Sequence, residues 1–269
     1  MTHIRYSIVA PCYNEEGNLR ELYEQVKSTL DQTNESWELV VINDGSQDRT
    51  LEIMRELNAL DPRVHFINFA RNFGHQIAVT AGMDYAQGDA IILMDADLQD
   101  PPALVLEMIQ KWKEGYEVVY AVRSDRVGES WFKLATAKLF YRIIYRITDV
   151  NIPLDTGDFR LMDRKVVEAM KQMHERHRFI RGMTSWVGFN QTGVYYVRQE
   201  RFTGDTKYPI RRMVKFAWDA VTSFSYFPLQ LAMYLGFVIA AISFPFIIFV
   251  IIARLSGYQA FLGQATTLV

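Results

Sequence analysis

Apolar and polar positions alternate along roughly the first 125 residues in a way that predicts strands and helices in turn. Short apolar runs rich in Val, Ile and Tyr predict strands at 6–14, 37–45, 63–70, 89–97 and 117–123. Between them, apolar residues recur at helical spacing near 15–31, 48–60, 74–86 and 102–114. This alternation predicts an α/β fold, a mostly parallel sheet with helices on both faces.

A much longer apolar stretch covers residues 229–253, and no charged residue occurs between Asp219 and Arg254. A helix of this length crosses a bilayer core, so the stretch predicts a transmembrane helix. The alternative is a buried helix of a soluble domain, which the length and lack of charge disfavour. Basic residues precede the stretch and, by the positive-inside rule, place residues 1–228 in the cytoplasm: Lys207, Arg211, Arg212 and Lys215.

The overall composition limits the class of protein. With 269 residues, 49% of them hydrophobic, the chain can bury one full α/β core and has room for little more than an appendage. The net charge of −2 is spread along the chain, which predicts no nucleic-acid partner. Cys12 is the only cysteine, which excludes an internal disulfide and fits a reducing compartment. The N-terminus leads directly into a strand, so no signal peptide is expected.

Polar residues follow the predicted strands at the end where parallel sheets bind ligands. They are Tyr13, Asn14 and Glu15 after the first strand, Asp44 after the second, Arg71 after the third, and residues 95–99 after the fourth. A G-x-G-x-x-G sequence is missing, which disfavours a dinucleotide site. The predicted site therefore lies at this edge but belongs to another ligand class.

The sequence "MDADLQDPP" ends the fourth predicted strand with three carboxylates. Asp100, followed by two prolines, is expected to cap the next helix. In an extended chain Asp95, Asp97 and Gln99 share one face, and such oxygen ligands suit Mg²⁺ or Mn²⁺. A solvated acidic turn is the alternative.

Five blocks in this order carry a family resemblance: "IVAPCYNEEGNL", "VVINDGSQDRT", "NFGHQIAVTAGMDYAQGD", "MDADLQDPP" and "DTGDFRLMDR". Together they resemble family 2 of the nucleotide-sugar glycosyltransferases, which have the GT-A fold. The closer likeness is to its polyprenyl-phosphate branch, which includes dolichyl-phosphate mannose synthases and bactoprenol glucosyltransferases. The resemblance covers about residues 4–228, and five ordered blocks are more specific than any one of them.

The resemblance implies inverting transfer of one sugar from a nucleotide diphosphate to a polyprenyl phosphate, such as undecaprenyl phosphate, at the cytoplasmic face of the inner membrane. UDP-glucose is the preferred donor, and Mg²⁺ or Mn²⁺ is the expected cofactor. Two other interpretations are a processive polysaccharide synthase and a catalytically silent membrane-anchored protein that binds nucleotide sugars. The Q-x-x-R-W block of processive synthases is missing.

The resemblance also assigns roles to individual residues on the donor side. Residues expected around the nucleobase and ribose are Pro11, Tyr13, Asn14, Glu15 and Asp44. Asp95 is expected to face the ribose and the metal, and Asp97, with Gln99, to ligate the metal. For Asp44, a turn or cap role in "NDGS" is the alternative.

On the acceptor side, the resemblance places Asp158 near the anomeric carbon as a base or as a group that positions the acceptor. A phosphate monoester has a second pKa of about 6, so Asp158 is expected to orient more than to deprotonate. A structural turn is the alternative. Basic residues expected to hold the diphosphate or the acceptor phosphate, unless they are plain surface charges, are Arg123, Arg126, Arg201, Lys207, Arg211, Arg212 and Lys215.

These patterns divide the chain into four parts. We expect a cytoplasmic catalytic domain at 1–207, an amphipathic juxtamembrane helix at 208–228, the transmembrane helix at 229–253 and a short tail at 254–269. Residues 131–149 predict a further helix on the membrane surface. Members of the branch usually carry two transmembrane helices, so a second span is expected beyond the tail. The single span also allows a homo-oligomer, although no G-x-x-x-G pattern marks an interface.

Overall fold

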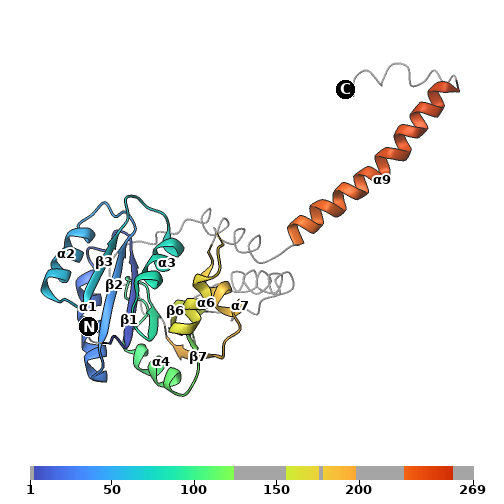
Figure 1. The fold of residues 1–269 in the computed structure, drawn as a ribbon. Coiled ribbons are helices and arrows are strands. Elements are labelled where there is room, and N and C mark those ends of the chain that lie inside the picture. The colour runs from blue at the N-terminus through green and yellow to red at the C-terminus, as the bar shows by residue number, and fades with distance from the viewer. Residues whose placement is uncertain (1–2, 124–155, 176–177, 198–226, 257–269) are drawn as a thin grey trace. The chain divides into compact units, whose positions relative to one another are not determined.

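The computed structural model describes residues 3–123, 156–175, 178–197 and 227–256. Seven strands form one sheet in the order β3-β2-β1-β4-β6-β5-β7 (Figure 1). Their bounds are β1 Tyr6–Cys12, β2 Trp37–Asn43, β3 Val64–Asn68, β4 Ala90–Leu93, β5 Val118–Arg123, β6 Thr156–Asp163 and β7 Gln191–Tyr196. The first five are the five predicted strands, each shorter than its apolar run.

The helices α1 to α4 connect the first five strands as the hydrophobic pattern predicts, and α6 and α7 were not predicted. The bounds are α1 Leu19–Leu30, the short 3-10 helix η1 Asp31–Thr33, α2 Thr50–Leu60, α3 His75–Tyr85, α4 Leu104–Lys113, α6 Arg164–Lys171, α7 Ile180–Trp186 and α9 Phe227–Leu255. The strands β1 to β4 are all parallel to one another, while β6 runs antiparallel between β4 and β5. The predicted mostly parallel α/β fold is confirmed.

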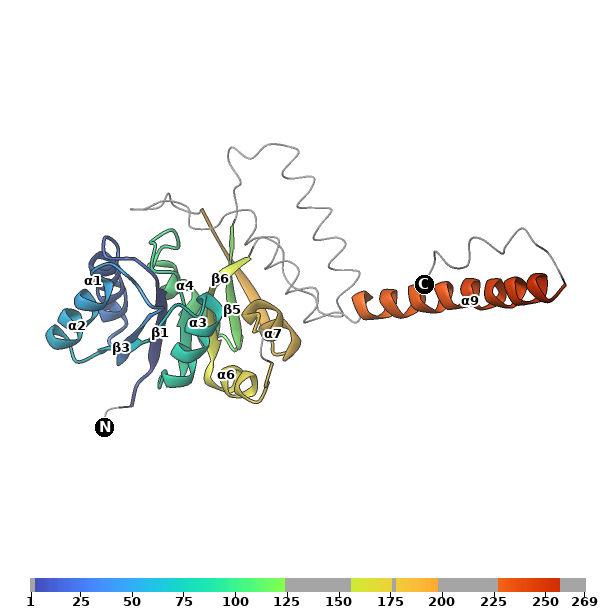
Figure 2. The ribbon, with the colours of Figure 1, turned by 90° about the horizontal axis from the view of Figure 1, so that it is seen from above.

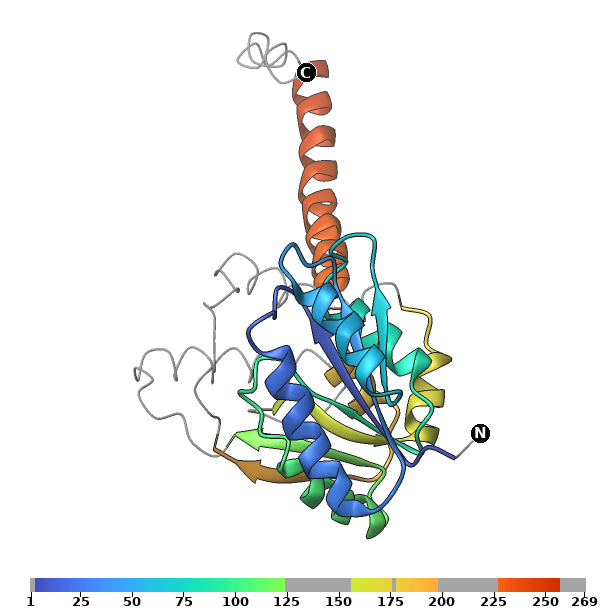
Figure 3. The ribbon, with the colours of Figure 1, turned by 90° about the vertical axis from the view of Figure 1, so that its left-hand side faces the viewer.

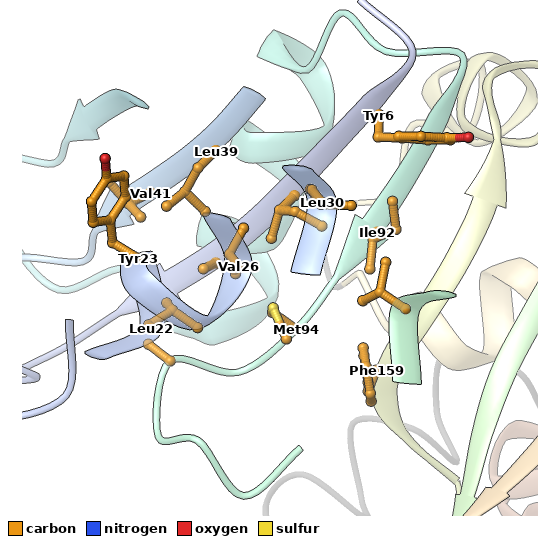
Figure 4. Packing of buried hydrophobic residues seen from close by; sticks show 14 of the residues in the cluster. Tyr6, Leu22, Tyr23, Val26, Leu30, Leu39, Val41, Ile92, Met94 and Phe159 are labelled. Carbon is orange, nitrogen blue, oxygen red and sulfur yellow. The ribbon is translucent and has the colours of Figure 1, made fainter. Parts of the chain in front are cut away.

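The sheet is buried on both faces because successive side chains of a strand point to opposite sides. One hydrophobic cluster joins Ile8 and Leu39 to α1, α2 and α4, and the other joins Val9 and Val40 to α3, α6 and α7. Figure 2 shows these helices distributed around the strands, and α1 lies over the strands in Figure 3. Part of the first cluster appears in Figure 4, which labels Val26 of α1 together with Leu39 and Val41 of β2. The two clusters fix the sheet, and with it the edge where the strands end.

The antiparallel strand β6 was not predicted from the sequence, and it brings a distant segment to that edge. Its register pairs Arg160 with Leu93 of β4. The pairing ends there, and Asp158 lies in β6 two residues before Arg160. The chain therefore returns from position 156 to meet the end of β4.

Two expectations for the segment after β4 are wrong. Asp100 is not a helix cap, because α4 begins at Leu104 with Ala103 as its N-cap; Asp100 is buried and accepts a hydrogen bond from the Tyr196 hydroxyl. Asp95, Asp97 and Gln99 do not follow an extended strand either, because β4 ends at Leu93 and the chain turns. Leu98 has a φ of 60°, so the three side chains do not share one strand face.

The chain divides into two compact units, Met1–Phe224 and Ser225–Val269. In the second, Leu229–Leu255 has a mean hydropathy of 2.8, is not buried within the structure, and is long and apolar enough to cross a membrane. Pro245 lies inside α9. The predicted span 229–253 falls within this helix, and its exposed apolar side chains differ from those of a buried core helix. The boundaries predicted at 207, 228 and 253 remain predictions.

Candidate active site

Strand ends and loops bring the candidate residues to one edge of the sheet. The carboxyl ends of β1 to β5 lie at this edge, and β6 begins there because it is antiparallel. Ligands of parallel α/β sheets bind beyond this edge. Two neighbouring parts can be distinguished, a cleft beyond β1, β2 and β3 and a group of charged side chains beyond β4, β5 and β6.

The cleft has a volume of about 450 Å³. Two of the residues predicted to bind the nucleotide line it, Tyr13 and Arg71. The Arg71 guanidinium lies over the ring of Phe73, 3.9 Å from its centroid. Its other lining residues are Asn43, Gly45, Ser46, Gln47, Leu51, Asn68, Phe69, Ala70 and Asn72. Polar edges beside an aromatic ring and a cation suit a nucleoside phosphate.

Asn14 and Glu15, which were predicted to contact the nucleotide, join the loops around the cleft. The Asn14 side-chain oxygen accepts the backbone N–H of Gln47 at 2.8 Å, and Glu15 accepts from the Asn18 amide at 2.6 Å. Pro11 lies within β1, next to Ile42 of β2. These three residues therefore support the loops and the strand that surround the cleft.

Asp44 is buried beneath the loop that follows β3. Its carboxylate accepts the backbone N–H of Phe73 at 2.7 Å and that of Gly74 at 3.0 Å. Burial raises the pKa of Asp44 above its ordinary value, and these two N–H groups offset part of that rise. Its carboxylate thus organises the distant loop at residues 73–74, whereas the alternative had placed its role in the local turn "NDGS". The direct nucleobase contact remains a prediction.

Beyond β4, Asp95 and Asp97 form an acidic pair. Burial, together with the charges of Asp100, Asp158 and Asp97, raises the pKa of Asp95 to about 6 against the opposing charge of His75. The Asp97 carboxylate is buried and accepts the backbone N–H of Gln99 at 3.2 Å. A divalent cation would relieve this excess of negative charge, so the donor set fits Mg²⁺ or Mn²⁺.

Among the described residues no three His, Cys, Asp or Glu side chains come together as a metal site. The aspartate pair would supply only part of the ligand shell, and substrate phosphates would supply more. Gln99 is redirected by the turn at Leu98. The ligand set of Asp95, Asp97 and Gln99 remains a prediction.

Three side chains converge on the buried carboxylate of Asp158. Arg181 donates through Nε to Oδ1 at 2.7 Å. Gln76 donates through its amide to Oδ2 at 3.1 Å, and the His75 Nε2 lies 3.0 Å from the same oxygen. Although burial favours the neutral acid, Arg181 and His75 hold the pKa of Asp158 well below its ordinary range. Asp158 is therefore an ionised group at neutral pH.

Basic groups surround this carboxylate. Buried Arg160 donates to the Gly157 carbonyl at 3.0 Å, and burial lowers its pKa to about 10. Within the described part of the chain its Nε has no hydrogen-bond partner. Arg123, one of the predicted phosphate ligands, ends β5 at the same edge and donates to the Tyr196 hydroxyl at 3.5 Å. Arg123 and Arg181, which are partly exposed, make this edge suited to phosphate.

The other predicted phosphate ligands lie outside the described residues: Arg126, Arg201, Lys207, Arg211, Arg212 and Lys215. The predicted membrane-surface helix at 131–149 and most of the one at 208–228 lie outside them too. Their roles therefore remain predictions.

Sequence reasoning missed His75, Gln76, Arg160 and Arg181. His75 and Gln76 belong to the quoted block "NFGHQ", a few residues beyond the third strand end, so the strand-end rule extended through the loop would have found them. Arg160 and Arg181 lie in β6 and α7, which carried no predicted element. Their proximity to Asp158 is a consequence of the antiparallel strand.

Comparison with known sequences agrees with this geometry. The family described as Glycosyl transferase family 2 matches residues 7–170. An uncharacterized glycosyltransferase, YkcC of Bacillus subtilis (strain 168), is 55% identical over 99% of this chain and 83% of its own length. A protein named prophage bactoprenol glucosyl transferase homolog of Escherichia coli (strain K12) is 41% identical over 99% of this chain and 87% of its own length.

Solved structures show the same fold. A mannosyltransferase from Pyrobaculum calidifontis, in complex with GDP-Man and Mn²⁺, is 16% identical with a TM-score of 0.53, covering 82% of this chain and 70% of its own. Glucosyl-3-phosphoglycerate synthase from Mycobacterium tuberculosis, in complex with Mn²⁺, UDP and phosphoglyceric acid, is 16% identical with a TM-score of 0.52, covering 81% and 76%. The fold is that of the GT-A glycosyltransferases. With its strand-end site and these sequence matches, the chain belongs to glycosyltransferase family 2 and is a glycosyltransferase.

Proposed function

We propose that this glycosyltransferase transfers one hexose, with glucose preferred, from a nucleotide diphosphate to a polyprenyl phosphate, with inversion at the anomeric carbon. UDP-glucose is the preferred donor and undecaprenyl phosphate the preferred acceptor. The E. coli relative is named for bactoprenol glucosyl transfer, and it supports this choice of substrates.

The observation that carries the proposal is the meeting of two charge types at one edge. Asp95 and Asp97 follow β4 with an excess of negative charge, and Asp158 lies in β6 among basic side chains. A metal-bound diphosphate fits the first part, and a phosphate nucleophile fits the second. The cleft lined by Tyr13 and Arg71 lies beyond the neighbouring strands and fits the nucleoside.

Mg²⁺ or Mn²⁺ held by Asp95 and Asp97 would neutralise the charge that develops on the leaving diphosphate. The protein side chains do the remaining work. Asp97 is kept in place by the Gln99 N–H, and Arg123 at the end of β5 is available to a phosphate.

The acceptor phosphate is the nucleophile. One of its oxygens forms the new bond to the anomeric carbon while the bond from that carbon to the diphosphate oxygen breaks, and both electrons leave with the diphosphate. At neutral pH this phosphate is largely deprotonated already, since its second pKa is about 6. Ionised Asp158, with its low pKa, orients Arg181 and His75 rather than accepting a proton.

The lipid acceptor requires a membrane. The apolar helix α9 is a candidate span, and the predicted basic residues before it favour a cytoplasmic catalytic domain. We propose that the protein is anchored in the cytoplasmic membrane with its active site at the cytoplasmic face. Association of several copies through the span is compatible with this arrangement.

The test is a transfer assay with purified protein in detergent. Radiolabelled UDP-sugars and GDP-sugars are each offered with polyprenyl phosphate, in Mg²⁺, in Mn²⁺ and in EDTA. The Asp97→Ala variant tests the acidic pair, and Asp84→Asn serves as control because Asp84 lies exposed on α3. A lipid carrying one glucose, formed by the protein and by the control but lost with EDTA and with Asp97→Ala, is the expected result.

Other outcomes would change the proposal. A product formed with another sugar would show that the donor is not UDP-glucose. Transfer that EDTA does not affect would show that the reaction needs no divalent metal. Long polymeric products would favour a processive synthase. No lipid-linked product from any donor would overturn the proposed acceptor.

A further inference from the structure

His75 lies near both Asp95 and Asp158, and the sequence predicted no role for it. It is the first residue of α3, and Gly74 precedes it with a φ of 102°, a conformation that favours glycine. The N–H of the same glycine donates to Asp44. Asp44, which directly follows β2, thus fixes the loop that places the imidazole in the site.

The imidazole reaches two carboxylates from different strands. Its Nε2 lies 3.0 Å from Oδ2 of Asp158 and 3.9 Å from Oδ1 of Asp95. The negative charges of these two aspartates are close enough to repel each other. An N–H at Nε2 between them offsets part of that repulsion. About a quarter of the His75 side chain is exposed, so the ring borders the open site.

The other donors to Asp158 act differently. Gln76 is held at both ends, because its amide oxygen accepts the N–H of Ile180 at 2.9 Å while its nitrogen donates to Asp158. Arg181, which lies in α7, donates to the other carboxylate oxygen of Asp158, Oδ1. Both join Asp158 to α7, whereas the His75 ring also lies 3.9 Å from Asp95.

We infer that His75 is a positioning residue of the transfer reaction, setting the spacing between Asp158 on the acceptor side and Asp95 on the donor side. This inference rests on the proposed function. In-line displacement requires the nucleophile and the leaving group to be aligned, and small misplacements reduce the rate strongly. Loss of the imidazole leaves Gln76 and Arg181 on Asp158, so the fold and the nucleotide cleft are retained.

The test compares His75→Ala and His75→Gln with the wild-type protein in the transfer assay and in UDP-glucose hydrolysis. His75→Ala is expected to lower kcat about 10- to 100-fold, with KM for the donor changed less than about threefold, because alignment is lost and donor binding is not. His75→Gln keeps an N–H donor near the position of Nε2 and is expected to recover most of the rate. His174→Ala is the matched control, since His174 is an exposed histidine away from the site.

Thermal unfolding of His75→Ala, Asp158→Asn and the double variant completes the experiment. Because His75 and Asp158 are in contact, the shifts in unfolding midpoint of the two single variants are not expected to add up to that of the double variant. This expectation holds whether or not a lipid is the acceptor. Additive shifts, an unchanged kcat for His75→Ala, or equal losses in kcat and donor affinity would each overturn the inference. If the wild-type protein hydrolyses UDP-glucose but glycosylates no lipid, the proposed acceptor fails, and the hydrolysis rates then decide the role of His75.

Discussion

Asp44 and Asp158 are both buried carboxylates at the same sheet edge, and the molecule treats them in opposite ways. Asp44 is 3% exposed and Asp158 is 8% exposed, so burial alone does not distinguish them. The pKa of Asp44 is raised, and that of Asp158 is held well below its ordinary range. The difference comes from their hydrogen-bond donors.

Backbone N–H groups surround one carboxylate and charged side chains the other. Phe73 and Gly74 offer Asp44 partial charges that do not fully offset its desolvation. Arg181 carries a full charge, and with His75 it outweighs the burial of Asp158. The comparison teaches that Asp44 mainly shapes a loop, whereas Asp158 maintains a fixed negative charge among cations. Substituting each aspartate by asparagine keeps the shape of the side chain and removes its charge, so it distinguishes the loop-shaping role of Asp44 from the charge role of Asp158.

The largest effect is expected for Asp158→Asn. The asparagine can accept from Arg181, but its amide nitrogen then faces the donors of Gln76 or His75, and the cations lose their counter-charge. We expect kcat for sugar transfer to fall about 1,000-fold. Nucleotide binding, measured by calorimetry, should change less than about threefold, because the cleft lies at other strands.

The Asp84→Asn control should keep the wild-type kcat. A fully active Asp158→Asn protein would break the comparison, because the charge at this position would then be dispensable. Loss of nucleotide binding in parallel with kcat would instead indicate general unfolding.

Asp61 sharpens the comparison, because it is a paired carboxylate outside the site. It lies before β3, at the opposite end of the parallel strands, and accepts from the Arg63 guanidinium and from Tyr23. Arg63 is the main reason that the pKa of Asp61 falls from 3.8 to about 2. Because the folded-state pKa is lower, the ionised carboxylate stabilises the protein above about pH 4, and this contribution disappears as the pH falls to about 2.

Asp61→Asn is therefore expected to lower the free energy of unfolding by about 1 to 2 kcal/mol at pH 7, with kcat unchanged. Denaturant unfolding at pH 7 and at pH 3 measures the first effect, and the gap between the variant and the wild-type protein should narrow at pH 3. A gap that is the same at both pH values would show that the pair does not stabilise the fold through its charge. A fall in kcat would contradict the separation of stability from catalysis.

The order of strands and helices up to position 123 could be predicted, because apolar runs and helical spacing are local signals. The strand-end rule also found Asp44, Arg71 and Asp95, since it needs only the order of elements. Strand β6 was missed because it is buried along almost its whole length and includes Asp158 and Arg160, so it lacks simple alternation. Polar residues at the starts of α3 and α7 resemble solvated helix residues until Asp158 of β6 is known to accept their hydrogen bonds.

The predicted alignment of Asp95, Asp97 and Gln99 failed for a different physical reason. It assumed an extended chain, but Leu98 adopts a positive φ that leucine rarely takes, and no local residue such as glycine signals the turn. Tertiary packing determines this backbone, since Leu98 itself is buried in the hydrophobic cluster with Ala96. The sequence therefore predicted the candidate residue types, and only the fold gave the directions of their side chains.

The smallest of these effects is expected for Asp44→Asn, and it decides which role Asp44 has. If Asp44 organises the loop, the asparagine oxygen still accepts one backbone N–H, and the Asn72 amide still donates to the residue 44 carbonyl at 3.1 Å. Affinity for UDP should then fall no more than about tenfold, or ~1.4 kcal/mol, because the loop bearing Arg71 loosens while the cleft keeps its lining. Calorimetry with UDP measures this loss. A loss of 100-fold or more, with an unchanged unfolding midpoint, would mean that the carboxylate accepts directly from the nucleobase, and the contrast with Asp158 would then lie in the ligand each one serves.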